Sequence, residues 1–201
     1  MTDGGTALNR LVTQIADGRS PGRAKAAPVD QWNPPFCGDI DMEIRADGTW
    51  YYLGTPIGRP ALVNLFASVL RKDEDGKTYL VTPVEKMGIR VVDAPFLIVG
   101  LDQLDGSDGH ALHVTTNVGE QITIGAANPL RFELQADTMG VKPYVHVRGR
   151  LEALMSRACT HELMNMGEHV EIDGVSQFAV QSQGHWYPIM ETRALEEAMA
   201  Q

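Results

Sequence analysis

Three carboxylates alternate along one short segment of the chain. Asp39, Asp41 and Glu43 are separated from one another by single apolar residues. In a β-strand, alternate residues lie on one face about 7 Å apart, so these carboxylates would form a row. Carboxylates held close together recruit a cation or an arginine. The row is a candidate divalent-metal or acid–base site, but the spacing alone favours the solvated face of an exposed hairpin.

Arginines gather in the second half of the chain, at Arg131, Arg148, Arg150 and Arg157. Arginine binds phosphate and carboxylate groups in a bidentate manner, so an anion-binding site is one interpretation. Cross-strand pairing with Glu133 and Glu152 is the other, and the spacing favours it.

Several catalytic signatures are incomplete. Residues 161–165, HELMN, resemble the start of a metalloprotease helix, but Asn165 stands where the second histidine ligand is needed. The segment GKT at 76–78 resembles a phosphate-binding loop, but Arg71 replaces its leading glycine. Cys159 and His161 would point apart on a helix, so they cannot act as nucleophile and base. We therefore predict no catalytic or metal-binding residue, and the sequence identifies no cofactor.

Strands and a helix are expected to position these side chains in the first half. The alternation at 39–45 predicts a half-buried strand, and Asp47-Gly48 predicts a turn into a partner strand. Pro60 suits the first position of a helix, whose apolar stripe continues to Leu70. Two more strands are expected at 79–82 and 87–91.

The second half is expected to be richer in strands. They are predicted at 96–101, 112–115, 121–124, 130–134, 144–148, 151–155, 178–181 and 185–189. Ser156 is the expected cap of a helix whose apolar stripe continues to Val170, and a short helix is expected at 194–199.

A weak internal repeat links the two halves. Residues 56–61 and 154–159 both join a strand to a helix, with Arg59 and Arg157 at equivalent positions 98 residues apart. We therefore expect an α+β fold of two similar small units, each an antiparallel sheet with a helix. The predicted boundaries are 1–31 for an N-terminal helix over 8–15 with its linker, 32–95 for the first unit and 96–201 for the second.

Composition limits the function classes. The net charge of −9 disfavours binding to long nucleic acid or to an anionic membrane. The two cysteines, Cys37 and Cys159, are far apart and form no metal-binding motif. The chain opens without a signal-peptide pattern, and its longest apolar stretch is too short to span a bilayer. These features predict a cytoplasmic protein.

Several unusual strings occur in an order that resembles one bacterial family. They are CGDIDMEIRADGTWYYLGTPIGRPALV, LRKDEDGKTYLVTPVEK, DAPF, TNVG, NPLRFE and PYVHVRGRLEA. The chain from about Pro35 onward resembles domain of unknown function family 1285. The resemblance implies a duplicated α+β core, a second unit superficially similar to pleckstrin-homology-like folds, a ligand site between the units and a role in signal transduction. It implies no established enzymatic activity.

The polar positions that match the family strings supply the candidate ligand-binding residues. They are Asp39, Asp41, Arg45, Trp50, Arg59, Thr82, Glu85, Lys86, Asp93, Asn117, Arg131, Tyr144, Arg148 and Arg150. Trp50 and Tyr144 could stack on an aromatic ring. Arg45, Arg59 and Arg148 could hold an anionic group. The leading hypothesis is a regulatory protein that binds a small molecule, with a nucleotide-like ligand as one candidate.

Two alternative functions remain open. The first is a metal-assisted hydrolase that uses Asp39, Asp41 and Glu43. The second is a protein-interaction module, in which the N-terminal helix is exchanged between subunits of a homo-oligomer. The loops at 82–86 and 93–96, with polar residues beside prolines, are where we expect the two units to join.

Overall fold

A computed structural model describes residues 12–13, 15, 26–106, 109–135 and 140–194. Contacts divide the chain into two compact units, Met1–Pro95 with Gly149–Leu151, and Phe96–Arg148 with Glu152–Gln201. Much of the expected N-terminal helix over 8–15, and almost all of the expected helix over 194–199, lie outside the described residues. Among the described residues, no helix is long and apolar enough to cross a membrane.

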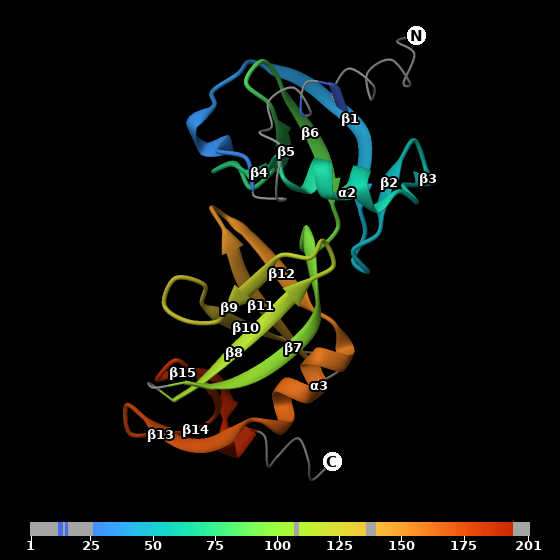
Figure 1. The fold of residues 1–201 in the computed structure, drawn as a ribbon. Helices are drawn as coiled ribbons and strands as arrows, with labels where there is room; N and C mark the ends of the chain where they lie inside the picture. Colours follow the sequence, from blue (N-terminus) through green and yellow to red (C-terminus); the bar gives the residue numbers. More distant parts are fainter. Residues whose placement is uncertain (1–11, 14, 16–25, 107–108, 136–139, 195–201) are drawn as a thin grey trace. The chain divides into compact units, whose positions relative to one another are not determined.

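The described residues of the first unit include a six-stranded sheet and the helix α2 (Figure 1). Its elements are η1 (Val29–Gln31), β1 (Phe36–Ile44), β2 (Trp50–Tyr52), β3 (Thr55–Pro56), α2 (Pro60–Ala67), β4 (Leu70–Lys72), β5 (Thr78–Val81) and β6 (Lys86–Val91). The strand order is β3-β2-β1-β6-β5-β4. The buried Phe66 of α2 stacks on Trp50 of β2 with ring centroids 6.2 Å apart, and this contact holds the helix on one face of the sheet.

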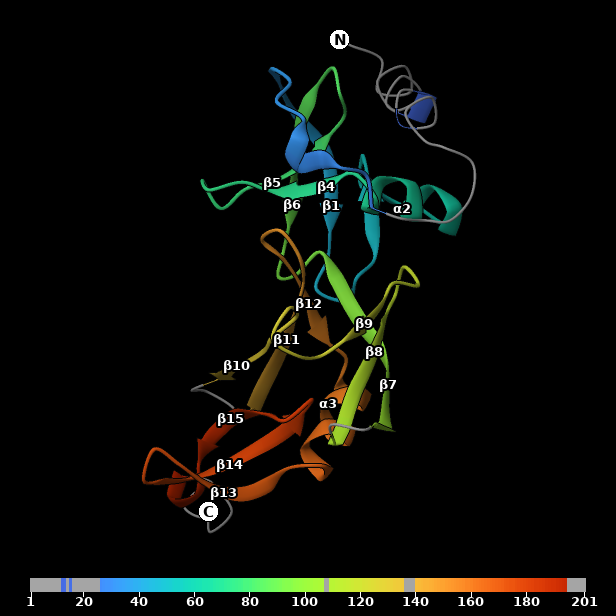
Figure 2. The same cartoon turned by 60° about the vertical axis from the view of Figure 1, so that its left-hand side comes forward.

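The described residues of the second unit include a six-stranded sheet, the helix α3 and a separate three-stranded sheet. Its elements are β7 (Phe96–Gly106), β8 (Gly109–Thr116), β9 (Gln121–Thr123), β10 (Leu130–Gln135), β11 (Gly140–Arg148), β12 (Leu151–Met155), α3 (Arg157–Asn165), β13 (Glu168–Ile172), β14 (Val175–Ser182) and β15 (His185–Glu191). The larger sheet has the order β10-β11-β12-β7-β8-β9. Figure 2 shows β14 between β13 and β15 in the small sheet.

The two six-stranded sheets share one topology. In each, two three-stranded meanders meet so that the first and last strands pair in parallel, β1 with β6 and β7 with β12. The α+β class is confirmed, but the sheets are not purely antiparallel as expected. The shared strand order supports duplication, whereas the likeness of the second unit to pleckstrin-homology folds stays a prediction.

The predicted repeat does not coincide with this shared topology. Helix α2 follows β3, the third strand of its sheet, whereas α3 follows β12, the sixth. Arg59 and Arg157 therefore stand at helix starts that are not equivalent. The physical reason is that the start of any helix after a strand favours similar residues, whatever its place in the sheet.

Both helices are shorter than their apolar stripes suggested. Helix α2 ends at Ala67, and Leu70 pairs with Leu80 in strand β4 instead of extending the helix. Helix α3 ends at Asn165, and Val170 lies on β13 opposite Gln177. The apolar residues beyond each helix lie on strands, where they are buried or half-buried. Their spacing happens to match that of a helix, so the apolar stripe extends past the true helix end.

Candidate functional site

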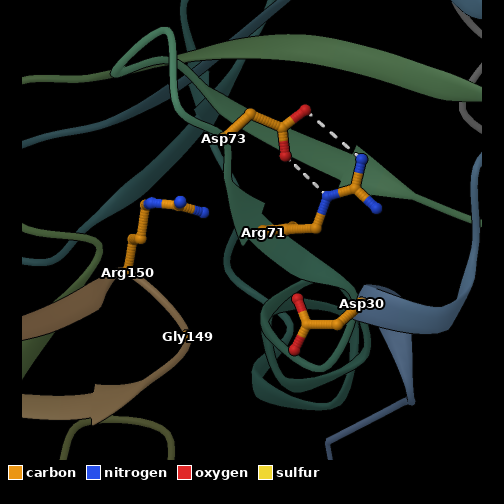
Figure 3. Close-up of a pocket in the computed structure, with 5 residues that line it drawn as sticks. All are labelled: Asp30, Arg71, Asp73, Gly149 and Arg150. Carbon is orange, nitrogen blue, oxygen red and sulfur yellow. Dashed lines mark hydrogen bonds and ion pairs between the residues drawn. The ribbon is translucent and has the colours of Figure 1, made fainter.

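A cavity of about 630 Å³ is lined by Asp30, Arg71, Asp73, Gly149 and Arg150. Figure 3 shows these five residues, with the guanidinium of Arg71 turned to the carboxylate of Asp73. Gly149 and Arg150 belong to the segment Gly149–Leu151, whose contacts group it with the first unit. The lining side chains are all charged, so the cavity suits a polar ligand.

Arg71 is held firmly in the wall of the cavity. Its Nε donates to Asp73 Oδ1 at 2.6 Å, and its Nη2 donates to Asp73 Oδ2 at 3.3 Å. Its Nη1 donates to the backbone carbonyls of Val29 and Trp32, at 2.8 and 2.7 Å. Four of its five N–H groups are thus used within the protein. Arg71 therefore fixes the turn η1 against strand β4.

The carboxylate of Asp73 forms ion pairs with two cationic side chains. Lys86 Nζ lies 2.9 Å from Asp73 Oδ2, in addition to the contacts from Arg71. Burial raises the pKa of Asp73, but hydrogen bonds from Arg71 and Lys86 and their positive charges outweigh burial and lower the pKa overall. Asp73 is therefore ionised and locally neutralised at neutral pH.

Lys86 also faces an aromatic ring. Its Nζ lies 4.4 Å from the ring centroid of Tyr79, whose hydroxyl donates to Asp75 at 2.5 Å. This hydrogen bond raises the pKa of Tyr79 to about 12. Lys86, predicted as a ligand-binding residue, thus acts in the structure as a partner of Asp73 and Tyr79.

Two charged groups on the cavity are less constrained. Arg150 Nη2 donates to Glu74 Oε1 at 2.7 Å, but the two side chains are 55% and 86% exposed. The side chain of Asp30 is exposed, and its carboxylate has no hydrogen-bond partner among the described residues. Arg150 and Asp30 are therefore the lining groups that a ligand can engage at little cost.

The three carboxylates lie on β1, but the pairing of β1 with β6 shifts in register between Asp39 and Glu43, and among the described residues they form no metal site. Glu43 pairs with Arg90 on β6 and with Arg45. Asp39 lies opposite Gly88, and its carboxylate occupies the space that a side chain at Gly88 would fill. In the part of the chain that the structure describes, no three histidine, cysteine or acidic side chains are placed to hold a metal ion.

Three of the predicted arginines, Arg131, Arg148 and Arg45, lie beside carboxylates or over aromatic rings. Arg131 makes a bidentate contact with Glu152, with both distances 2.6 Å, and also donates to Glu133 at 2.5 Å. Arg148 donates to Glu120 at 2.7 Å. The structure thus shows the cross-strand pairing of Arg131 that the sequence favoured. Arg45 lies over the ring of Tyr51, 3.6 Å from its centroid.

The two predicted stacking residues are buried. Trp50 is 1% exposed and stacks on Phe66, and Tyr144 is 4% exposed beneath the guanidinium of Arg131. A ligand ring needs an open aromatic face, so a stacking role for Trp50 and Tyr144 does not fit this structure. Burial of these large rings in the core stabilises the fold more than exposure at the surface would.

The remaining predicted residues are scattered and mostly structural. Thr82 is buried, and its hydroxyl accepts from the backbone N–H groups of Val84 and Glu85, which caps the turn before β6. Asn117 accepts from the backbone of Leu97. Of the other four, Asp41 and Arg59 are exposed, Asp93 is half-buried and Glu85 is buried. The expected position of a ligand between the two units stays a prediction.

Four of the five cavity residues were not predicted from the sequence, namely Asp30, Arg71, Asp73 and Gly149. Arg71 lies on β4, and Asp73 directly follows that strand and begins a turn in which its carbonyl accepts from the backbone N–H of Gly76. Their alternation across Lys72 was the available signal, since alternate residues on a strand share a face. No sequence pattern connects Asp30 with Arg71, which lies 41 positions further on.

Comparisons with known proteins agree on one family. The model of the DUF1285 N-terminal domain, a domain of unknown function, matches residues 27–94, and that of the DUF1285 C-terminal domain matches residues 95–189. No curated protein matches the chain.

Two solved structures are similar to this chain. One is a DUF1285 family protein from Silicibacter pomeroyi DSS-3, with 45% identity, a TM-score of 0.81, and coverage of 92% of this chain and 97% of that one. The other is a DUF1285 family protein from Shewanella baltica OS155, with 31% identity, a TM-score of 0.49, and coverage of 62% and 90%.

Proposed function

We propose a ligand-binding function for this chain, which belongs to the DUF1285 family of proteins of unknown function. In this proposal it is a regulatory protein of a signalling process, and its ligand is a small anionic molecule of the nucleotide type. The ligand occupies the cavity that Arg150 lines. The volume of about 630 Å³ supports this, because sites for small molecules and cofactors usually measure about 300–1,000 Å³.

The proposal rests on Arg150, a cavity-lining arginine whose ion pair with Glu74 is exposed to solvent. A guanidinium at a cavity binds a phosphate well, because its planar N–H groups match two phosphate oxygens. Its present partner, Glu74, is almost fully exposed. Exposed ion pairs contribute only about 0–1 kcal/mol, so a ligand phosphate displaces Glu74 at little cost.

The neighbouring Arg71 has a different role in the proposal. It retains one N–H of Nη2 for a ligand, since its other four are used by Asp73, Val29 and Trp32. Arg71 therefore shapes the cavity and supplies positive charge, while Arg150 supplies the main anion contact.

Isothermal titration of the full chain with AMP, GMP, ADP and GDP tests the proposal. We expect at least one nucleotide to bind, and Arg150→Ala to weaken that binding about tenfold through loss of a charge-assisted contact. Arg90→Ala is the matched control, because Arg90 is an exposed, ion-paired arginine of the same unit that does not line the cavity. The affinity of Arg90→Ala for the nucleotide should equal that of the wild type.

Two results would contradict the proposal. One is a folded wild-type protein that binds none of the four nucleotides. The other is binding that Arg150→Ala and Arg90→Ala affect equally, since the cavity would then not be the site.

A further inference from the structure

The carboxylate of Asp30 is presented to the cavity from a fixed turn. Asp30 lies in the middle of η1 (Val29–Gln31), and Arg71 Nη1 binds the carbonyls of Val29 and Trp32 on either side of it. Backbone hydrogen bonds from Gln31 to Pro28 and from Trp32 to Val29 close the same turn. A group held in this way is organised before the ligand arrives, which favours specific recognition.

Asp30 also faces the turn that carries Arg150. Its Oδ1 lies 3.9 Å from the point that a Cβ on Gly149 would occupy, and Figure 3 shows the carboxylate directed toward the Gly149 turn. The cavity thus offers a cation on one side, at Arg150, and an acceptor on the other, at Asp30. These two groups have different ligand requirements.

The other acidic group of the lining is already satisfied. Asp73 accepts from Arg71 and Lys86, whereas Asp30 has no partner among the described residues. An ionised carboxylate accepts hydrogen bonds and repels anions. A ligand that fills the cavity must therefore place its anionic group at Arg150 and hydrogen-bond donors at Asp30.

We infer that Asp30 accepts hydrogen bonds from a pair of ligand hydroxyls, so that the ligand is a phosphorylated sugar such as a nucleotide with both ribose hydroxyls. Two neighbouring hydroxyls suit the two oxygens of one carboxylate. The inference rests on the proposed function, because it concerns the same cavity. It adds a requirement that the anion contact at Arg150 does not impose.

The test compares AMP and GMP with their 2′,3′-dideoxy forms, by titration of the full chain. We expect the wild type to bind the ribose form about tenfold more tightly than the dideoxy form. Asp30→Asn should remove most of this preference, because it replaces one acceptor oxygen by a donor. Asp47→Asn, an exposed aspartate in a turn of the same unit, is the matched control and should keep the preference.

The outcomes separate the two proposals. Equal wild-type affinity for ribose and dideoxy forms, with binding still weakened by Arg150→Ala, overturns the role of Asp30 and leaves the anion site intact. This comparison needs no variant at Asp30, so it decides the matter even if Asp30→Asn does not fold. A persistent ribose preference in folded Asp30→Asn also overturns it. Failure of every nucleotide to bind overturns the proposed function itself.

Discussion

At the scale of single residues, arginines that look alike in the sequence have different roles in the structure. Arg131 donates to two carboxylates across and along strands, and Arg71 donates to a carboxylate and two carbonyls. Arg150 has one exposed ionic partner in Glu74. The free energy needed to break the existing hydrogen bonds or ion pair therefore decides which of these guanidinium groups is available to a ligand.

Asp73→Asn tests the charged wall of the cavity. The native pKa of Asp73 lies below its ordinary value of 3.8, so its stabilising effect is complete above that value and is lost as the pH falls through the native pKa. We expect Asp73→Asn to lower the free energy of unfolding by about 1–3 kcal/mol at pH 7. The difference from wild type should shrink below about pH 4, as measured by urea unfolding.

Asp102→Asn provides the control for this measurement. Asp102 is an exposed aspartate on β7. Its replacement should change the free energy of unfolding by less than about 0.5 kcal/mol. If the difference in free energy of unfolding between Asp73→Asn and wild type stayed constant from pH 7 to pH 3, the stabilising role of the ionised carboxylate would be contradicted.

At the scale of elements, the junction between α3 and β13 depends on a glycine. A Cβ at Gly167 would overlap three ring atoms of Phe178 on β14. That ring is half-buried and lies beside His169, with centroids 5.3 Å apart, so a shift of the ring would disturb this contact. The close approach of β14 to the end of α3 therefore requires the absence of a side chain.

Gly167→Ala should destabilise the protein by about 1–3 kcal/mol through overpacking, as measured by chemical unfolding. Gly58→Ala is the matched control, because no atom lies within 4 Å of its added Cβ, and its effect should be below about 0.5 kcal/mol. Phe178→Leu combined with Gly167→Ala should cost less than the sum of the single changes. Strict additivity would show that the ring is not the obstacle.

At the scale of the whole molecule, one sheet topology occurs twice with different covering elements. Helix α2 connects the two meanders of the first sheet, whereas α3 and the β13–β15 sheet follow the second. Each unit has its own buried core, with Phe66 fully buried in the first and Leu163 in the second. The stability of each unit is therefore expected to respond to its own core.

Hydrogen exchange followed by mass spectrometry tests this independence in the full chain. Phe66→Ala and Leu163→Ala should each destabilise by about 2–5 kcal/mol. We expect Phe66→Ala to accelerate exchange in β5 and β6, and Leu163→Ala to accelerate exchange in β7 and β11, which α3 contacts. Uniform acceleration along the chain for both variants would contradict the prediction and show one cooperative unit.

Local patterns in the sequence were sufficient for several elements. Alternation predicted β1, Asp47-Gly48 predicted the turn to β2, and Pro60 and Ser156 marked the helix starts, because neighbouring residues determine these features. The quoted strings also predicted the family, which the comparisons confirm. Helix ends were predicted poorly, since strand pairing takes over the last apolar residues of each stripe.

The cavity was decided by tertiary structure alone. Arg71 reaches the carbonyl of Val29 across 42 positions, and Arg131 reaches Glu152 across 21. Sequence shows which residues carry charge, but the pairing of those charges depends on distances set by the folded sheet. For that reason the strand that carries Asp39, Asp41 and Glu43 could be predicted from sequence, and the presence of Asp30 and Arg150 at one cavity could not.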